Sequence, residues 1–190
     1  MAAQAPKRRI AITGGICEGK STVCGYLREL GYAVANADEA AREVFEEEPV
    51  QRALALALGC EAPVSRQQVR DRLALDPDFR RTLNRITHPR ILERLDQLEA
   101  SFVEVPLLVE ACLQGRFDRV WVVTCGPEEQ LRRLAQRLGS KAEARRLMAT
   151  QLPTRAKIPF ADAVIRTNRP ESDVQAFVAE LASREFAGAG

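Results

Sequence analysis

Residues 14–22 read Gly14-Gly15-Ile16-Cys17-Glu18-Gly19-Lys20-Ser21-Thr22, directly after the apolar run Ile10-Ala11-Ile12. This is the Gly-x-x-x-x-Gly-Lys-Ser pattern of a phosphate-binding loop, or P-loop, between an expected strand and an expected helix. Glycines let backbone N–H groups turn inward around an anion, and the N-terminus of the following helix adds positive charge. The pattern therefore predicts nucleoside triphosphate binding, with Lys20 on the β- and γ-phosphates and the Ser21 hydroxyl on Mg²⁺.

Composition is that of a water-soluble protein of one domain. The chain has 190 residues, a formal net charge of +2 and an apolar fraction of 46%. The charge is too small for bulk nucleic-acid binding, and no apolar run is long enough for a membrane span. Residues 1–9 lack the apolar run of a signal peptide. The five cysteines are scattered, so they predict a reduced, cytoplasmic protein without a zinc site, in which Cys112 and Cys125 are core thiols.

Strand and helix patterns alternate at both ends of the chain. Apolar runs predict strands over residues 10–13, 32–35, 102–105, 119–124 and 163–167. Helical spacing predicts helices over residues 20–30, 38–47, 50–58, from 127 on, 140–152 and 173–186. Three more helices are expected to open at the capping box Ser65-x-x-Gln68, at Asp76-Pro77, and at Thr87-His88-Pro89.

The alternation predicts an α/β fold of three layers around a parallel five-stranded sheet, the P-loop NTPase fold. We expect a nucleotide-binding core over residues 8–48, 102–134 and 158–187. A helical substrate lobe is expected over residues 49–101, and an arginine-bearing lid over residues 135–157. Because the carboxyl ends of parallel strands share one edge, the P-loop, Asp38 and Pro106-Leu107 should meet in one cleft.

The type of P-loop protein is narrowed by motifs that the sequence lacks. Without an Asn-Lys-x-Asp motif, a GTPase is disfavoured, and without an apolar strand that runs into Asp-Glu, so is a motor ATPase. A short chain with many arginines between Leu131 and Lys157 favours a small-molecule kinase, whose lid closes over ATP.

Five groups of residues resemble the dephospho-coenzyme A kinase family. They are Ile12-Thr13-Gly14-Gly15-Ile16 leading into Gly19-Lys20-Ser21-Thr22; Asn36-Ala37-Asp38 with Ala41-Arg42; His88-Pro89; Glu104-Val105-Pro106-Leu107-Leu108-Val109-Glu110; and Gln151-Leu152-Pro153 followed by Ala161-Asp162 and Asn168. The resemblance covers nearly the whole chain, in order and spacing. It implies transfer of the γ-phosphate of ATP to the ribose 3′-hydroxyl of dephospho-coenzyme A, with Mg²⁺ as the metal.

The same resemblance implies roles for single residues. Asp38, Lys20 and Arg137 would be catalytic, with Asp38 as the base and Arg137 on the ATP phosphates. ATP would be bound by the whole P-loop and by Asn168 near the adenine. The acceptor would be bound by a set of residues around the cleft: Thr13, Asp38, Arg42, His88, Pro106 and Leu107. A monomer is favoured as the oligomeric state.

Each role has a simpler alternative. Asp38 has the residue type of a helix N-cap, and Arg42 and Arg137 have that of surface charges. His88 is the only histidine and could be a helix-start polar residue. Pro106 and Leu107 could be ordinary packing at the end of a strand.

Four residues depart from the family pattern. The family usually has glycine at the position of Cys17, a small residue at Glu18, aspartate at Asn36 and glutamate at Arg155. If position 17 requires a positive φ, cysteine strains the loop there. Two alternative functions therefore stay open: another small-molecule P-loop kinase, for nucleotides or a sugar acid, and a catalytically weakened nucleotide-binding module.

Overall fold

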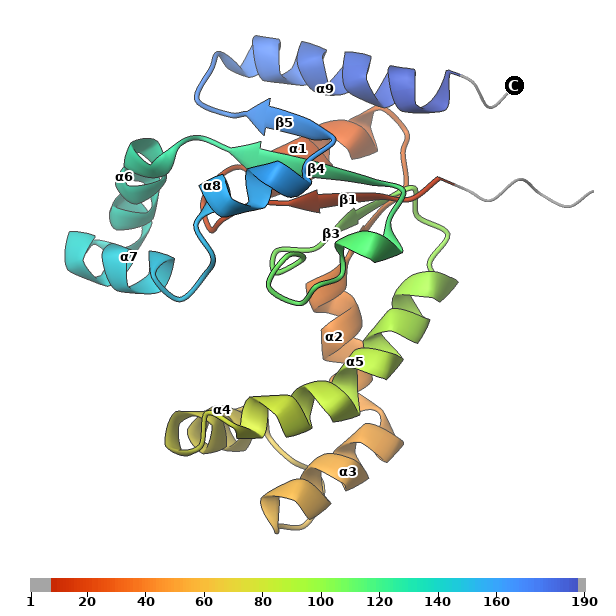
Figure 1. Ribbon diagram of the computed structural model, residues 1–190, viewed down its shortest axis with the longest axis vertical. Coiled ribbons are helices and arrows are strands. Elements are labelled where there is room, and N and C mark those ends of the chain that lie inside the picture. The colour runs from red at the N-terminus through yellow and green to blue at the C-terminus, as the bar shows by residue number, and fades with distance from the viewer. Residues whose placement is uncertain (1–7, 188–190) are drawn as a thin grey trace, which may run out of the picture. The chain divides into compact units, whose positions relative to one another are not determined.

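The computed structural model describes residues 8–187. It contains a five-stranded sheet with the strand order β2-β3-β1-β4-β5 (Figure 1). The strands are β1 (Ile10–Thr13), β2 (Val34–Asn36), β3 (Phe102–Glu104), β4 (Arg119–Thr124) and β5 (Ala163–Arg166). β1 pairs in parallel with β3 and β4, and β4 pairs in parallel with β5. The predicted parallel α/β sheet is confirmed.

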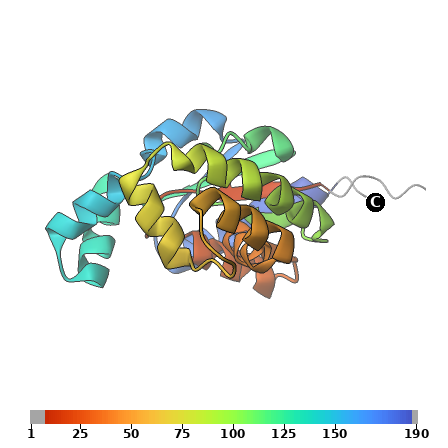
Figure 2. The same cartoon turned by 90° about the horizontal axis from the view of Figure 1, so that it is seen from below.

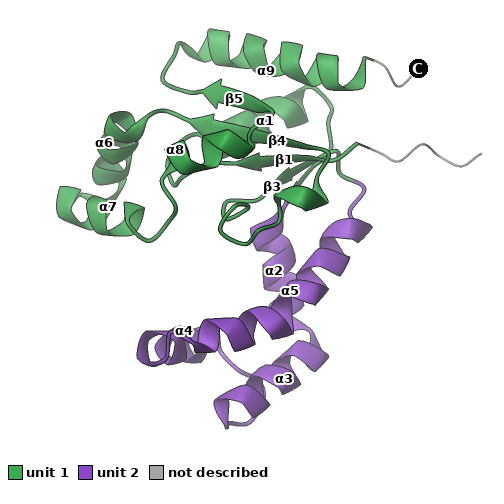
Figure 3. Cartoon of the chain, viewed as in Figure 1, with its two compact units in different colours: residues 1–35, 100–190 green, residues 36–99 purple. Residues whose placement is uncertain are grey.

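The helices fall into two compact units (Figure 3). Unit 1, residues 1–35 and 100–190, holds α1 (Lys20–Glu29), α6 (Pro127–Leu138), α7 (Lys141–Met148), α8 (Thr154–Lys157) and α9 (Glu171–Phe186). Unit 2, residues 36–99, holds α2 (Ala37–Glu46), α3 (Glu48–Leu58), α4 (Arg66–Leu75) and α5 (Phe79–Gln97). Within residues 8–187, no helix has the length and apolar character needed to cross a bilayer.

The core of unit 1 lies between the sheet and the helix pair α1 and α9. Side chains alternate along a strand, so Ile10 and Ile12 both point to this face, where they are buried with Trp121 and Val123. Phe102 packs on Trp121 with ring centroids 5.1 Å apart. α8 contacts β4 on the sheet's other side. These layers hold β1 rigidly, and the P-loop begins where β1 ends.

Unit 2 has its own core among its four helices (Figure 2). Val44 of α2, Leu54 of α3, Val69 of α4 and Phe79 of α5 are all buried in one cluster. α2 packs against both α3 and α5. This packing is why the unit begins at residue 36, before the lobe of residues 49–101 that the sequence suggested.

The helix predicted to open at Asp76-Pro77 is α5, which begins just after them at Phe79, but the prediction of a separate helix at Thr87-His88-Pro89 is wrong. α5 runs on through these residues to Gln97 and carries Pro89 in its interior. An interior proline costs about 3 kcal/mol, because it removes one hydrogen bond and clashes with the preceding turn. Phe79 before the proline and Ile91 after it pack into the same core. Burial on both sides of Pro89 therefore outweighs the local cost.

The segment after α7 also differs from its prediction. Ser140 caps α7 as expected, since its Oγ accepts the N–H of Glu143 at 3.2 Å. The helix ends at Met148, however, and not near Leu152. Pro153 disfavours helical backbone at Leu152, and the Leu152 N–H donates instead to Glu110 Oε1 at 3.1 Å. The segment thus exchanges helical bonds for tertiary ones.

Within residues 8–187, two non-glycine residues have left-handed backbone: Cys17 with φ 58° and Cys112 with φ 55°. The suspected positive φ at Cys17 is therefore confirmed. Cys112 was predicted to be a core thiol, but it is exposed. It lies at the end of the turn that follows residues 105–110, and its N–H donates to Val109 O at 3.0 Å. Cys125 is buried, as predicted.

Removing the cap of α4 should destabilise the fold. Ser65 Oγ accepts the Gln68 N–H at 3.2 Å, and Gln68 Oε1 accepts the Ser65 N–H at 2.8 Å. We expect Ser65→Ala to lower the free energy of unfolding by about 1 kcal/mol in a urea titration. Ser183→Ala, at an exposed position within α9, is the control and should change it by less than about 0.5 kcal/mol. Equal effects would contradict the capping role.

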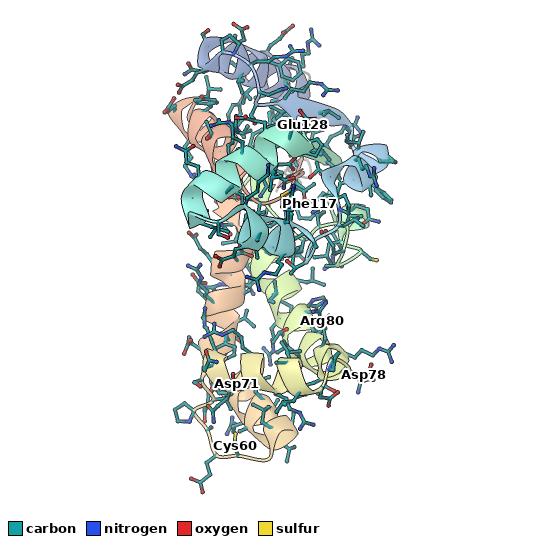
Figure 4. All side chains as sticks on the ribbon, turned by 90° about the vertical axis from the view of Figure 1, so that its left-hand side faces the viewer. Cys60, Asp71, Asp78, Arg80, Phe117 and Glu128 are labelled. Atoms are coloured by element: carbon teal, nitrogen blue, oxygen red, sulfur yellow. The ribbon has the colours of Figure 1, made fainter. Side chains whose placement is uncertain are left out.

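Glycine at either left-handed position should stabilise the fold. We expect Cys17→Gly and Cys112→Gly each to raise the free energy of unfolding by roughly 1 kcal/mol, since strain is relieved and partly offset by unfolded-state entropy. Cys60 lies in the exposed loop after α3 and has no positive φ (Figure 4). Cys60→Gly should therefore bring no gain in the same titration, and a gain as large as at Cys17 would rule out strain relief as the cause.

Candidate active site

The P-loop runs from the end of β1 to the start of α1 and is shaped by two glycines. Gly14 has φ 152° and Gly19 has φ 95°. A Cβ atom on Gly14 would lie 2.3 Å from the Val123 carbonyl oxygen, and one on Gly19 would lie 3.0 Å from the Thr167 side chain. The loop therefore passes so close to the end of β4 and to the residue after β5 that only glycine fits.

In the first half of the loop, the backbone N–H groups of Gly15 and Ile16 are bonded to side chains. The Gly15 N–H donates to Glu18 Oε2 at 2.5 Å and to Thr154 Oγ1 at 3.1 Å. The Ile16 N–H donates to Gln151 Oε1 at 3.1 Å. Both N–H groups are thus taken up by protein acceptors, two of which come from the segment just before and at the start of α8.

The second half of the loop offers free donors. In α1, the first N–H with a helical acceptor is that of Val23, which donates to Gly19 O at 3.1 Å. No side chain caps this helix in the described part of the chain. The N–H groups of Lys20, Ser21 and Thr22 are therefore left for an external acceptor. A helix N-terminus of this kind binds phosphate through its N–H groups and its dipole.

Lys20 is buried at the base of this loop. Its Nζ donates to Gly15 O at 2.9 Å. Burial lowers the pKa of Lys20, while the nearby carboxylates of Glu104 and Glu18 act in the opposite direction. Glu104 ends β3, where it pairs with Ile12 of β1. The sequence did not single out Glu104 as a site residue, because a glutamate at the end of a strand carries no pattern of its own.

Thr13 and Pro106, both predicted to bind the acceptor, lie together. Thr13 Oγ1 donates to Pro106 O at 3.3 Å. The same carbonyl accepts a bond of 2.9 Å from the Nζ of Lys157, a fully buried residue that also pairs with Glu110 at 2.8 Å. Leu107 is exposed. Lys157 is a second buried cation near Lys20, and sequence reasoning missed it.

Arg137 lies near the P-loop, on the last turn of α6. Its Nη1 is 4.0 Å from Cys17 Sγ. The Cys125 thiol reaches the same loop residue, since its Sγ donates to Cys17 O at 3.9 Å. Burial raises the pKa of Cys125 to about 11, so this thiol stays protonated. The guanidinium is thus beside the loop where the phosphates are predicted to bind.

Asn168 lines an open pocket of about 550 Å³. Its other lining residues come from the end of β4 and the start of α6: Cys125, Gly126, Pro127, Glu128, Glu129 and Arg132. Glu128, labelled in Figure 4, is exposed in the first turn of α6. Thr167, which precedes Asn168, donates to Glu18 O at 2.7 Å. The pocket therefore adjoins the P-loop, although its binding of adenine stays a prediction.

Two arginines and a glutamate on α6 support this pocket. The guanidinium groups of Arg132 and Arg133 both donate to the Glu129 carboxylate, and they hold its pKa at about 2. Arg133 also donates to Thr167 O at 2.8 Å. α6 is thereby attached to the turn between β5 and α9.

A second cavity, of about 510 Å³, lies against the first half of the P-loop. Its apolar lining comes mostly from the end of α7 and the segment that follows it: Met148, Ala149, Leu152, Pro153 and Ile158. Its polar lining residues are Glu18, Thr124, Gln130, Gln151, Thr154, Arg155 and Arg166. The cavity borders the hydrogen bonds that hold the loop.

The remaining predicted residues, Asp38, Arg42 and His88, belong to unit 2. The Asp38 N–H donates to Asn36 Oδ1 at 2.8 Å, so Asn36 is the N-cap of α2 and the N-cap alternative for Asp38 is wrong. Asp38 and Arg42 are exposed and lie four residues apart on one face of α2. His88 is half-buried within α5, so its predicted place at a helix start is wrong as well. The functional roles of all three stay predictions.

Ser21 and Glu104 supply oxygen donors of the kind that Mg²⁺ prefers. Ser21 is exposed in the first turn of α1, and Glu104 is close enough to Lys20 to raise its pKa. Mg²⁺ usually takes one or two protein oxygens and fills its octahedron with waters and substrate phosphates. These residues therefore fit a phosphate-bound Mg²⁺. Residues 8–187 contain no cluster of three or more His, Cys, Asp or Glu side chains for a protein-only metal site.

Comparison with known proteins assigns the family. Residues 8–173 match the family model described as dephospho-CoA kinase. A dephospho-CoA kinase from Geobacter metallireducens is 38% identical over 180 residues, which cover 86% of this chain and 89% of the relative. One from Escherichia coli is 34% identical over 185 residues, which cover 90% of each chain.

A solved structure has the same fold. The protein TT1252 from Thermus thermophilus superposes with a TM-score of 0.75 at 32% identity, over 93% of this chain and 97% of that one. The match to the family model covers most of the chain, and the relatives match along nearly their whole length. The chain belongs to the dephospho-CoA kinase family.

Proposed function

We propose that this protein transfers the γ-phosphoryl group of ATP to the ribose 3′-hydroxyl of dephospho-coenzyme A, giving coenzyme A and ADP. The single observation that carries the proposal is a P-loop with free N–H groups at the start of α1 and a buried Lys20, in a chain of this family. In the reaction a bond forms between the 3′-oxygen and the γ-phosphorus. The bond from that phosphorus to the β,γ-bridging oxygen breaks, and the hydroxyl proton goes to a base.

The donor half of the reaction needs its phosphate charge neutralised. Lys20 has two neighbouring carboxylates that favour its charged form, in opposition to burial. An arriving triphosphate adds more negative charge and favours the ammonium further. The Lys20 ammonium would exchange its bond to Gly15 O for bonds to the β- and γ-phosphates. Arg137, beside Cys17, is well placed to add a second positive charge.

Mg²⁺ would be held by the Ser21 hydroxyl, and Glu104 is the carboxylate that most strongly favours the charged form of Lys20. When bound, the metal neutralises phosphate charge and helps to orient the γ-phosphoryl group. Every other task falls to groups of this chain. The loop N–H groups orient the phosphates. The Lys20 ammonium stabilises the negative charge that develops on the leaving oxygen.

The acceptor half needs a base and a binding surface. We assign the base to Asp38, whose exposed carboxylate lies in the first turn of α2. It would take the proton of the 3′-hydroxyl while Arg42, one turn later on the same face, binds the acceptor. Thr13, Pro106, Leu107 and His88 would bind other parts of dephospho-coenzyme A.

Water must be excluded, because an ATP γ-phosphate that meets water is hydrolysed. We assign this task to residues 135–157 as a lid. This segment carries arginines at positions 137, 145, 146 and 155. Closure of this segment over ATP would bring its arginines to the phosphates, and it would do so only when nucleotide is bound.

The proposal includes a cytoplasmic enzyme that acts as a monomer on soluble substrates. Five cysteines of the described chain are free, which fits a reducing compartment. Neither the other small-molecule kinase nor the weakened binding module gains support from a specific contact. Asn36 caps α2, so this departure has a local structural reason. Cys17 keeps the positive φ of the loop at the cost of strain.

Replacing the base should separate turnover from nucleotide binding. We expect Asp38→Asn to lower kcat by about 100-fold or more, because a positioned general base contributes that much. The Kd for ATP, measured by calorimetry, should change less than about twofold, since the donor site is untouched. Asp71→Asn, on exposed α4, is the matched control and should keep full turnover.

The same assay distinguishes the substrate from its alternatives. Dephospho-coenzyme A should be phosphorylated much faster than nucleoside monophosphates or gluconate under equal Mg²⁺ and ATP. Unchanged turnover in Asp38→Asn would show that the base lies elsewhere. A faster reaction with a nucleotide or a sugar acid would refute the proposed acceptor.

A further inference from the structure

Glu18 is a charged side chain buried inside the P-loop. Only 1% of its surface is exposed, and carboxylates are almost never buried to this degree without partners. Position 18 is one of the variable positions of the Gly-x-x-x-x-Gly-Lys-Ser pattern, so the pattern itself gives this carboxylate no role. The role of Glu18 has to be inferred from its contacts.

Three donors satisfy the Glu18 carboxylate. Its Oε2 accepts the Gly15 N–H at 2.5 Å and also accepts a short bond from the Thr154 hydroxyl. Its Oε1 accepts the Thr124 hydroxyl at 2.9 Å. Hydrogen bonds to a charged acceptor are stronger than neutral ones, and they offset the cost of removing the carboxylate from water.

These donors come from separate parts of unit 1. Thr124 ends β4, Thr154 opens α8, and Gly15 belongs to the loop itself. The main chain of Glu18 is also held, because Thr167 donates to its carbonyl at 2.7 Å. The carboxylate thus attaches the P-loop to the sheet on one side and to the head of α8 on the other.

The attachment to α8 is doubled by a second bond. Gln151, three residues before Thr154, accepts the Ile16 N–H at 3.1 Å. Gln151 and Thr154 lie at the end of the segment that we assign as the lid, residues 135–157. The first half of the P-loop is therefore attached to this segment by hydrogen bonds to two of its residues.

We propose that Glu18 is a positioning residue for ATP binding. Its buried carboxylate joins the Gly15 N–H, in the first half of the P-loop, to Thr154 at the start of α8. Held in this way, the N–H groups at the start of α1 and the Lys20 ammonium keep the geometry that receives the phosphates. The carboxylate binds no phosphate itself, since its oxygens are occupied by Gly15, Thr124 and Thr154.

A simple electrostatic view predicts the opposite result. A negative charge near a triphosphate repels it, so removing that charge should tighten ATP binding. The positioning role predicts weaker binding, because Glu18→Gln replaces an acceptor of three bonds by an amide that accepts through one atom only. The sign of the change in ATP affinity therefore decides between the two.

The experiment measures the Kd for Mg-ATP by calorimetry in the full-length protein, without an acceptor substrate. We expect Glu18→Gln and Thr154→Val each to weaken ATP binding by about tenfold, as expected for loss of a bond to a charged group. Thr154→Ser restores the hydroxyl and should bind as the unaltered protein does. Ser183→Ala, at an exposed hydroxyl on α9 and outside the lid, should leave the Kd unchanged.

A double variant tests whether the two residues act through one contact. If they do, Glu18→Gln combined with Thr154→Val should weaken ATP binding little more than either change alone. In the coupled assay, KM for ATP should rise while KM for dephospho-coenzyme A stays the same. Additive effects, or equal rises in both KM values, would overturn the proposal.

Other outcomes also contradict the positioning role. Unchanged or tighter ATP binding in Glu18→Gln overturns it, as does a loss of thermal stability with no change in Kd. If Glu18→Gln fails to fold, the comparison of Thr154→Val with Thr154→Ser still decides. This inference takes only one element from the proposed function, the assignment of residues 135–157 as a lid. ATP affinity is measured without acceptor, so a failure to phosphorylate dephospho-coenzyme A would leave this test intact.

Discussion

The close approach of the P-loop to the sheet is the constraint on which the site depends. Gly14 and Gly19 pass against the end of β4 and against Thr167 at distances that exclude any side chain. The strands behind them are held by a buried core between the sheet and the helices α1 and α9. A rigid sheet edge therefore forces the chain into a tight turn, and that turn exposes the N-terminal N–H groups of α1.

The loop has two halves with different duties. The first half has its N–H groups bonded to Glu18, Thr154 and Gln151, whereas the start of α1 keeps donors for a ligand. This division explains how a chain with Cys17 and Glu18 in its P-loop keeps the phosphate-binding geometry. Cys17 adopts the left-handed backbone that glycine usually supplies, and Glu18 turns inward to bind the protein.

Local patterns predicted much of this structure. The P-loop, the parallel sheet and the caps at Ser65 and Ser140 follow from short-range rules, because spacing and side-chain hydrogen bonds act within a few residues. The course of α5 through Pro89 could not be predicted this way, since burial along both halves of the helix decides it.

Contacts between residues distant in sequence explain the other features that the sequence did not predict. Lys157 is buried by partners far away in sequence, so no local signal marks it. The P-loop pattern includes Glu18, but the burial of its carboxylate depends on Thr124 and Thr154, which are distant in sequence. Thr13, Pro106 and the P-loop are predicted site residues that unit 1 brings together. Asp38, Arg42 and His88 are predicted site residues of unit 2, and their roles rest on the family resemblance.

The most direct test of the central claim is the identity of the product. Purified protein would be incubated with Mg²⁺, dephospho-coenzyme A and ATP labelled in the γ-phosphate. Phosphorus NMR and mass spectrometry would then locate the label. The proposed function predicts one labelled phosphoryl group on the ribose 3′-oxygen, with ADP formed in equal amount. Release of labelled inorganic phosphate without labelled coenzyme A, or label at any other oxygen of the acceptor, would contradict it.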